Sequence, residues 1–390
     1  MYIDLTPEQR QLRDDLRSYL DQLLTDELQA ELEHSEGGGP EYYAAMAKLG
    51  ADGWLGLGWP KAYGGQERPA IEQFIFFDEV QRAGFPIPIL TLNTVGPTLA
   101  SFGTDAQREA YLPGILAGKT HFSIGYTEPN AGTDLASLTT TAVRDGDEWV
   151  INGQKIWTSL AGHADYIWLA CRTNPDVPKH KGISLIIVPT SAEGFSKTPM
   201  NTLGGNETFT CYYDNVRVPY DNVVGGENNG WKLITTQLNH ERVALVAVGP
   251  LKRFNEEVLA WAKEIELTDG RTLADEAWVQ ANLAKCHAHL EVLKLFNWRQ
   301  AQNIEAGELN PAEASCLKVF GSELFIDGYR LLMQVLGESG HLKKGSAGAA
   351  LQGRIERYYR AIMVLTFGGG TNEVQRDIIS MVGLGMPRAR

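Results

Sequence analysis

The stretch HFSIGYTEPNAGTDLAS, residues 121–137, lies where the character of the sequence changes. From this point, short β-branched or aromatic runs alternate with Gly, Asp, Asn and Pro, which is typical of antiparallel strands joined by turns. The runs continue through FTCYYDNVRVP, residues 209–219, and stop at GGENNGW, residues 225–231. The sequence therefore predicts a β-domain over residues 121–230.

The segments on either side of this β-domain have helical character. Thr6, Pro7 and Gln9 form a helix start signal with a capping box, and leucines recur at helical spacing after it. Beyond Trp231 the helical pattern returns and continues through Ser380. We predict an α+β fold with an N-terminal α-helical domain over residues 1–120, the middle β-domain, and a C-terminal α-helical bundle over residues 231–390.

Composition and charge exclude several classes of protein. The 390 residues are 43% hydrophobic and 21% charged, as expected of a globular protein. A formal net charge of -13 offers no basic face for a nucleic acid. We see no signal peptide and no apolar run long enough to span a membrane, and the four cysteines have no metal-site spacing. We therefore expect a cytoplasmic protein with reduced thiols, no bound metal, and neither a nucleic-acid nor a membrane partner.

Three motifs carry the functional information: GYTEPNAGTDLAS at residues 125–137, NGQKIWTS at 152–159 and GGTNEVQRD at 369–377. Their order and spacing, and the helix–strand–helix order, resemble those of the acyl-CoA dehydrogenase family over essentially the whole chain. The resemblance implies FAD bound between the β-domain and the C-terminal helices. It also implies α,β-desaturation of an acyl-CoA thioester, with electrons passed to an electron-transfer flavoprotein. No G-x-G-x-x-G follows a strand, so a Rossmann dinucleotide site is disfavoured.

The first two motifs supply the residues expected around the flavin. By resemblance, Tyr126 and Thr127 lie at the flavin's pyrimidine edge, while Thr133 is near the thioester and pantetheine of the substrate. Trp157 matches an indole packed beside the flavin ring, with polar contacts from Thr158 and Ser159. Read alone, Pro, Asn, Gly and Thr in the first motif are ordinary turn residues, and a single tryptophan is more often part of a core.

The third motif lacks the base that many family members place before Gly-Thr, because Gly369 stands there. Its backbone N–H can still face a thioester carbonyl, so we expect Gly369 to contact substrate. Family members of the isovaleryl and long-chain types carry the base on a helix after the β-domain, in a Leu-x-x-Glu-Arg pattern. LNHERVALVA, residues 238–247, matches that pattern and makes Glu241 the predicted base, oriented by Arg242. A helical Glu-Arg pair is also common on solvated surfaces, and we interpret His240 as structural.

Further resemblance concerns a neighbouring subunit. Gln334 and Gly337 match a loop that contacts the adenosine diphosphate part of FAD, and Thr371 and Glu373 match positions near its adenine and pyrophosphate. The family's Arg-x-x-Phe-Gly segment, which reaches a neighbour's FAD, is replaced by DGRTLA, residues 269–274. Arg271 is a displaced substitute or is unrelated.

That departure resembles the base-bearing subunits of α2β2 acyl-CoA dehydrogenases that act on steroid (cholesterol) side chains, in which a second, non-identical subunit completes each FAD site. Three alternatives stay open: a homotetrameric fatty or branched-chain acyl-CoA dehydrogenase, an acyl-CoA oxidase of the same fold, and a non-catalytic subunit that completes another chain's FAD site.

Overall fold

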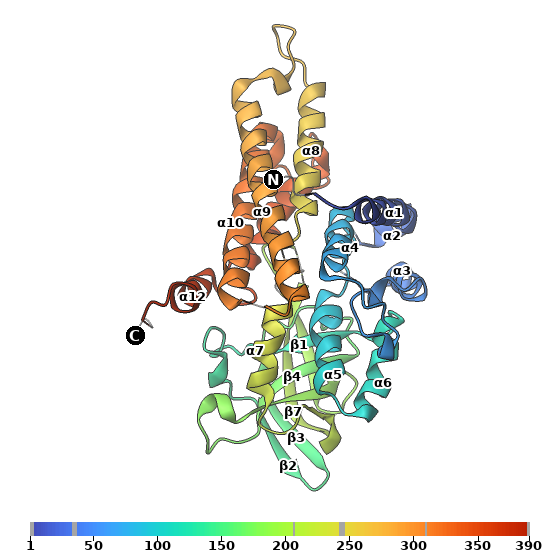
Figure 1. The fold of residues 1–390 in the computed structure, drawn as a ribbon, viewed down its shortest axis with the longest axis vertical. Coiled ribbons are helices and arrows are strands. Elements are labelled where there is room, and N and C mark those ends of the chain that lie inside the picture. Colours follow the sequence, from blue (N-terminus) through green and yellow to red (C-terminus); the bar gives the residue numbers. More distant parts are fainter. Residues whose placement is uncertain (1–3, 33–36, 206, 242–245, 309, 388–390) are drawn as a thin grey trace.

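Three regions follow one another along the chain and occupy separate parts of the molecule (Figure 1). The computed structural model describes residues 4–32, 37–205, 207–241, 246–308 and 310–387. The C-terminal helices form one end, the sheet forms the other, and the N-terminal helices lie along the side of both. The predicted α+β order is confirmed.

The N-terminal region begins with the predicted capping box. The Thr6 hydroxyl accepts from Gln9 N–H at 3.2 Å, and the Gln9 side chain accepts from Thr6 N–H at 2.9 Å. The helices here are α1 (Pro7–Leu23), α2 (Asp26–Leu32), α3 (Pro40–Ala51), α4 (Ala70–Ala83), α5 (Gly96–Phe102) and α6 (Asp105–Leu116). A π-turn, Thr91–Val95, leads directly into α5.

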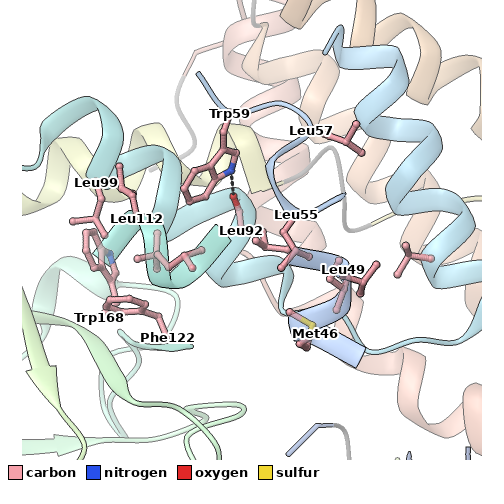
Figure 2. Packing of buried hydrophobic residues seen from close by; sticks show 14 of the residues in the cluster. Met46, Leu49, Leu55, Leu57, Trp59, Leu92, Leu99, Leu112, Phe122 and Trp168 are labelled. Carbon is pink, nitrogen blue, oxygen red and sulfur yellow. Dashed lines mark hydrogen bonds between the residues drawn. The ribbon is translucent and has the colours of Figure 1, made fainter. Parts of the chain in front are cut away.

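The Gly- and Trp-rich loop between α3 and α4 folds inward through Trp59. Its indole N–H donates to Leu92 O at 3.1 Å, and the ring lies against the π-turn side of the core (Figure 2). A Cβ at Gly96 would lie 2.0 Å from this indole, so α5 must begin with glycine. The loop therefore joins the two halves of the helical region.

The middle region is an eight-stranded sheet in the order β6-β7-β3-β2-β4-β5-β8, with β1 paired to β4. The strands are β1 (Phe122–Gly125), β2 (Thr141–Asp145), β3 (Glu148–Lys155), β4 (Tyr166–Arg172), β5 (Ile183–Pro189), β6 (Phe195–Asn201), β7 (Glu207–Pro219) and β8 (Val223–Val224).

Most strand pairs are antiparallel as predicted, but β1 runs parallel to β4, and β2 touches β4 in parallel at Thr141–Arg172. The predicted antiparallel β-domain is confirmed, with β1 added to it as a parallel strand. The β2–β3 hairpin separates β1 from β4, and this long connection returns the chain to β4 in the same direction as β1.

The C-terminal region consists of α7 (Gly230–Glu241), α8 (Gly249–Glu264), α9 (Ala277–Glu305), α10 (Pro311–Leu336), α11 (Arg354–Ala361) and α12 (Asn372–Ile378). In Figure 1, α7 lies against the sheet beside α5, while α8, α9 and α10 extend away from it. Helix α7 is thus packed on the β-domain, which Arg360 of α11 also contacts by donating to Leu203 O.

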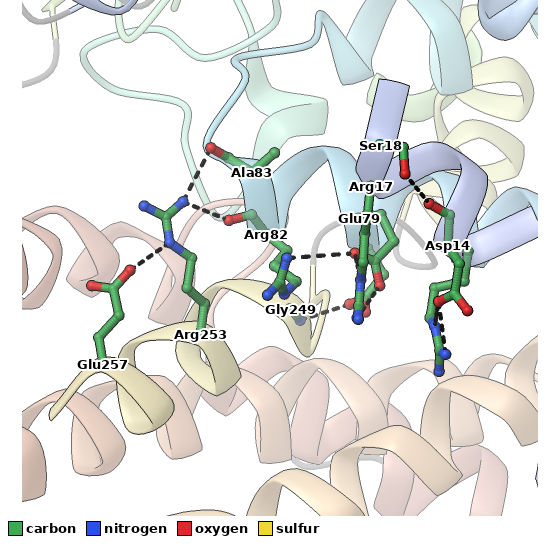
Figure 3. A network of polar contacts seen from close by, with 11 residues as sticks. Asp14, Arg17, Ser18, Glu79, Arg82, Ala83, Gly249, Arg253 and Glu257 are labelled. Carbon is green, nitrogen blue, oxygen red and sulfur yellow. Dashed lines mark hydrogen bonds and ion pairs between the residues drawn. The ribbon is translucent and has the colours of Figure 1, made fainter. Parts of the chain in front are cut away.

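Helices α4 and α8 are joined by polar contacts (Figure 3). Arg253 of α8 donates to the carbonyl oxygens of Arg82 and Ala83, at 2.8 and 3.1 Å, and so caps the C-terminal end of α4. Arg17 of α1 makes two 2.7 Å hydrogen bonds to the buried Glu79 carboxylate of α4. The N-terminal helices are therefore fixed to the bundle by groups that also satisfy helix ends.

Candidate active site

Two of the three motifs meet at one end of the sheet. Ile156 N–H donates to Thr127 O at 2.8 Å, so the loop after β1 lies beside the residues that follow β3. Tyr126 and Thr127 are half-buried there. The structure therefore brings the 125–137 and 152–159 motifs together.

Beneath this meeting point lies a buried ion pair, Glu128–Lys155. The Lys155 ammonium donates to a Glu128 carboxylate oxygen at 2.8 Å and to Tyr126 O at 3.0 Å. Glu128 also accepts from Thr139 N–H and Thr140 N–H, at 2.6 and 2.8 Å, and so closes the loop at its base. Burial alone would raise the pKa of Glu128, but the Lys155 charge and these donors outweigh it and lower the pKa to about 2.

Trp157 has a backbone conformation that L-residues rarely adopt. Its φ is +61°, and its side chain is 58% exposed although the neighbouring Thr158 is fully buried. Thr158 N–H donates to Phe209 O at 3.0 Å, and Ser159 O accepts from the Ser123 hydroxyl at 2.8 Å. The flanking residues are thus fixed to the sheet while the indole is turned outward. Backbone strain of this kind is concentrated at ligand sites.

Helix α7 reaches the same place through Gln237, whose side-chain oxygen accepts from the Tyr126 hydroxyl. The described part of this helix runs as far as Glu241, one turn further along. The side chains of residues 238–241, which include His240 and the predicted base, lie outside the described residues, as does all of Arg242.

The third motif forms a glycine turn before α12. Gly369 and Gly370 have φ of +69° and +96°, which favour glycine, and both are exposed. Thr371 caps α12 by accepting from Val374 N–H at 3.2 Å, and Glu373 lies exposed on the first turn. The buried Lys318 ammonium of α10 holds the turn by donating to Gly370 O at 2.6 Å.

The structure separates this turn from Gln334 and Gly337. Lys318 and Gln334 both lie on α10, sixteen residues apart, which is about 24 Å along a helix. Gln334 is exposed, and Gly337 ends α10 with φ of +60°. Within one chain, these residues are therefore not part of the site at the sheet.

Arg271 lies in the connection between α8 and α9. Its guanidinium is exposed and pairs with Asp269 and Glu276, both at 2.8 Å. Within this chain, its interactions are local.

Thr133 is exposed on the loop after β1. Asp134 of the same loop pairs with Lys179 at 2.5 Å, and Lys179 directly precedes His180, which lines a cavity of about 540 Å³. The cavity is lined by three basic side chains, two asparagines, a tryptophan and a threonine: His180, Lys181, Lys232, Asn228, Asn229, Trp231 and Thr235.

Comparison with known proteins identifies the family. The sequence matches the models of the acyl-CoA dehydrogenase N-terminal domain over residues 6–119, middle domain over 123–216 and C-terminal domain over 228–384. It is 56% identical to acyl-CoA dehydrogenase FadE26 of Mycobacterium tuberculosis, with 100% of both chains covered. The chain belongs to the acyl-CoA dehydrogenase family.

Two solved structures resemble this acyl-CoA dehydrogenase throughout. A chain of the ChsE4-ChsE5 complex from Mycobacterium tuberculosis matches with a TM-score of 0.94 and 56% identity, covering 100% of both chains. A chain of the Tcur3481-Tcur3483 steroid ACAD matches with a TM-score of 0.94 and 52% identity, again over 100% of both chains. Chains of acyl-CoA dehydrogenase architecture thus align with this one from end to end.

The residues at the sheet fit the flavin that the family implies. An exposed indole in a strained conformation lies beside a loop held rigid by Glu128 and Lys155, and aromatic faces of this kind stack on planar rings. Sequence reasoning assigned no role to Glu128, Lys155, Gln237 or Lys318. Glu128 and Lys155 lie inside the first and second quoted motifs. Because both motifs were expected around the same flavin, their opposite charges were a signal that the two side chains could form an ion pair.

The described ranges contain neither a membrane-spanning helix nor a metal-binding cluster. No helix there is long and apolar enough to cross a membrane. Nor do three or more His, Cys, Asp or Glu side chains gather as a metal ion would require, counting only those same ranges.

Proposed function

We propose that this acyl-CoA dehydrogenase is the base-bearing subunit of an enzyme that desaturates the Cα–Cβ bond of an acyl-CoA, with Glu241 as the base. The observation that carries the proposal is the glycine turn. Gly369, at the position of the family's common base, has no side chain and a φ of +69°, which a substituted residue rarely adopts. The base would then come from another element, and Glu241 lies on α7, the helix that packs on the sheet.

The reaction removes a weakly acidic α-proton, which requires a positioned base and a polarised thioester carbonyl. In this proposal the Glu241 carboxylate accepts the Cα proton, and Gly369 N–H donates to the carbonyl oxygen. FAD, when bound, supplies the acceptor for the hydride that leaves Cβ. Tyr126, Thr127, Trp157, Thr158 and Ser159 would hold the flavin ring. Electrons then pass to an electron-transfer flavoprotein.

The cavity lined by His180, Lys181 and Lys232 supports a CoA thioester as substrate. His180, Lys181 and Lys232 place basic groups on one wall in a protein of net charge -13. The nucleotide end of CoA is polyanionic, and the Trp231 indole offers a surface for a base. Thr133 would then contact the pantetheine between this cavity and the flavin.

A second, non-identical subunit completes each FAD site in this proposal, and the substrate is a steroid side-chain thioester. Gln334 lies about 24 Å along α10 from Lys318, which holds the glycine turn, and Gly337 follows α10, so both would serve the FAD of another subunit. Thr371 and Glu373, at the glycine turn itself, would lie near the adenine and pyrophosphate of FAD. The similar structures support both parts, since one is a complex of two named proteins and the other is a steroid ACAD.

Substitution of Glu241 by Gln tests the base. The carboxamide is nearly isosteric but does not accept a proton, so the rate of flavin reduction by acyl-CoA should fall on the order of 10³-fold or more. The measurement is anaerobic stopped-flow bleaching of the flavin band. The matched control is Glu264→Gln, an exposed carboxylate at the end of α8, which should leave the rate unchanged.

An E241Q enzyme that reduces its flavin at the wild-type rate would contradict the assignment and favour the non-catalytic subunit. Reoxidation of the reduced flavin by air as fast as turnover would favour an acyl-CoA oxidase instead.

A further inference from the structure

A row of buried and partly buried hydrogen bonds crosses from the sheet to the N-terminal helices through α7. We call it the Gln237 bridge, and it comprises Trp168, Tyr126, Gln237 and Thr98. The Trp168 indole N–H donates to the Tyr126 hydroxyl at 3.2 Å, which in turn donates to the Gln237 side-chain oxygen. The Gln237 amide nitrogen donates to the Thr98 hydroxyl at 3.0 Å. Three separate elements, β4, α7 and α5, are thus joined by side chains alone.

Gln237 is the centre of this bridge, and its burial keeps water from replacing its hydrogen-bond partners. It is 2% exposed, and both ends of its amide are bonded to other elements. Trp168 belongs to a cluster of buried hydrophobic side chains that includes Phe122 of β1 and Leu99 of α5, and both lie close to it in Figure 2. A buried polar network that is fully paired fixes one geometry, because any shift leaves a donor or acceptor unpaired.

Both ends of the bridge are themselves anchored. The Thr98 hydroxyl donates to Thr94 O, at 2.7 Å, in the π-turn. The Thr91 hydroxyl of the same turn donates to Phe122 O and accepts from Phe122 N–H, at 3.2 and 3.0 Å, at the start of β1. Strand β1 leads into Tyr126, so the path closes on itself. Such π-turns are frequent at functional sites.

We propose that Gln237 is a positioning residue that sets helix α7, and with it the Glu241 turn, against the Tyr126–Thr127 loop. The proposal rests on the proposed function for its catalytic consequence, because it takes Glu241 as the base. Gln237 lies one turn before Glu241 on the same helix, and its two partners come from the flavin-facing loop and from α5. The bridge therefore couples the position of α7, which carries Glu241, to the Tyr126–Thr127 loop and to α5.

The test replaces Gln237 by Leu, which is similar in size and forms neither hydrogen bond. In the flavin-loaded enzyme, co-expressed with its second subunit and given a steroid side-chain CoA thioester, kcat should fall about 10- to 100-fold while KM changes less than about three-fold. Amide hydrogen exchange in residues 230–237 should become faster, since α7 has lost its lateral anchors. Tyr126→Phe should reproduce part of the loss, and the double variant should be no worse than Q237L.

The matched control is Gln300→Leu in α9. Gln300 is also 2% exposed, but its amide nitrogen has no hydrogen-bond partner among the described residues, so its removal breaks no bridge described there. Q300L should keep wild-type kcat and wild-type exchange in α7. Wild-type kcat or unchanged α7 exchange in Q237L would overturn the inference. If no CoA thioester reduces the wild-type flavin, the proposed function fails, while the exchange measurement still decides whether the bridge holds α7.

Discussion

At the scale of single residues, the Glu128–Lys155 pair is the polar contact on which the flavin loop depends. Both side chains are almost fully buried, and removal of one member leaves a charge without its partner in a low-dielectric interior. Lys155 also supports Tyr126 O directly, so its loss frees the loop from the end of β3. Stability and flavin retention should therefore fall together.

Lys155→Met should lower the free energy of unfolding by about 3–5 kcal/mol. Urea denaturation followed by fluorescence measures this, and the flavin-to-protein absorbance ratio measures cofactor retention. The control is Lys179→Met, which breaks the exposed pair with Asp134, whose members are 54% and 59% exposed, and should cost less than about 1 kcal/mol. Equal stability of K155M and K179M would show that the buried pair has no special role.

At the scale of elements, the start of α8 is capped by a carboxylate from α4. Gly249 N–H donates to Asp78 Oδ1 at 2.7 Å. Burial raises the pKa of Asp78 to about 6 although this hydrogen bond opposes the shift. Because the folded pKa lies above the unfolded value of 3.8, the folded state binds the proton more tightly. Stability from this group is greatest at low pH and declines as pH rises through about 6.

Asp78→Asn keeps an acceptor for Gly249 N–H but removes the titration. Relative to D78N, the wild type should gain about 1–2 kcal/mol in unfolding free energy when the pH is lowered from 8 to 5. Urea unfolding of both proteins at several pH values provides the difference curve. Asp105→Asn serves as control, since the Asp105 side chain is 92% exposed. The unfolding free energy of D105N should change with pH as that of the wild type does. If the unfolding free energies of D78N and the wild type change with pH in the same way, Asp78 does not contribute to the pH dependence of stability.

At the scale of the whole molecule, the distribution of the predicted FAD residues along α10 determines what assembly is needed. One chain places Trp157 just after β3 and Gln334 near the C-terminal end of α10. Helix α10 extends away from the sheet (Figure 1). The chain expressed alone should therefore hold little flavin. Co-expression with a neighbouring gene for a second acyl-CoA dehydrogenase subunit should give a yellow complex of the mass of four chains.

Flavin absorbance and light scattering of the two preparations measure this. A yellow homotetramer from the single chain, bleached by simple acyl-CoAs, would contradict the two-subunit proposal and favour an ordinary fatty or branched-chain substrate. A complex bleached only by steroid side-chain thioesters would support it.

The sequence by itself determined the three-part order and the first helix start. Capping residues, helical periodicity and runs of β-branched residues act over a few neighbours, so Thr6, Pro7 and Gln9 were predicted correctly. The sequence also identified the motifs at residues 125–137 and 152–159 as typical of one family, since each motif is a short run of consecutive residues. It did not show that β1 runs parallel to β4, because strand direction depends on how a distant segment returns.

Only the tertiary structure decided which polar residues meet. Gln237 lies 111 residues from Tyr126 and 139 from Thr98, and nothing in its own neighbourhood marks it as buried and paired. The same holds for Lys318, whose ammonium supports a glycine turn 52 residues away. Local pattern fixes which segments become helix or strand, whereas hydrogen bonds between distant side chains form only after those segments have packed, and they give the site its geometry.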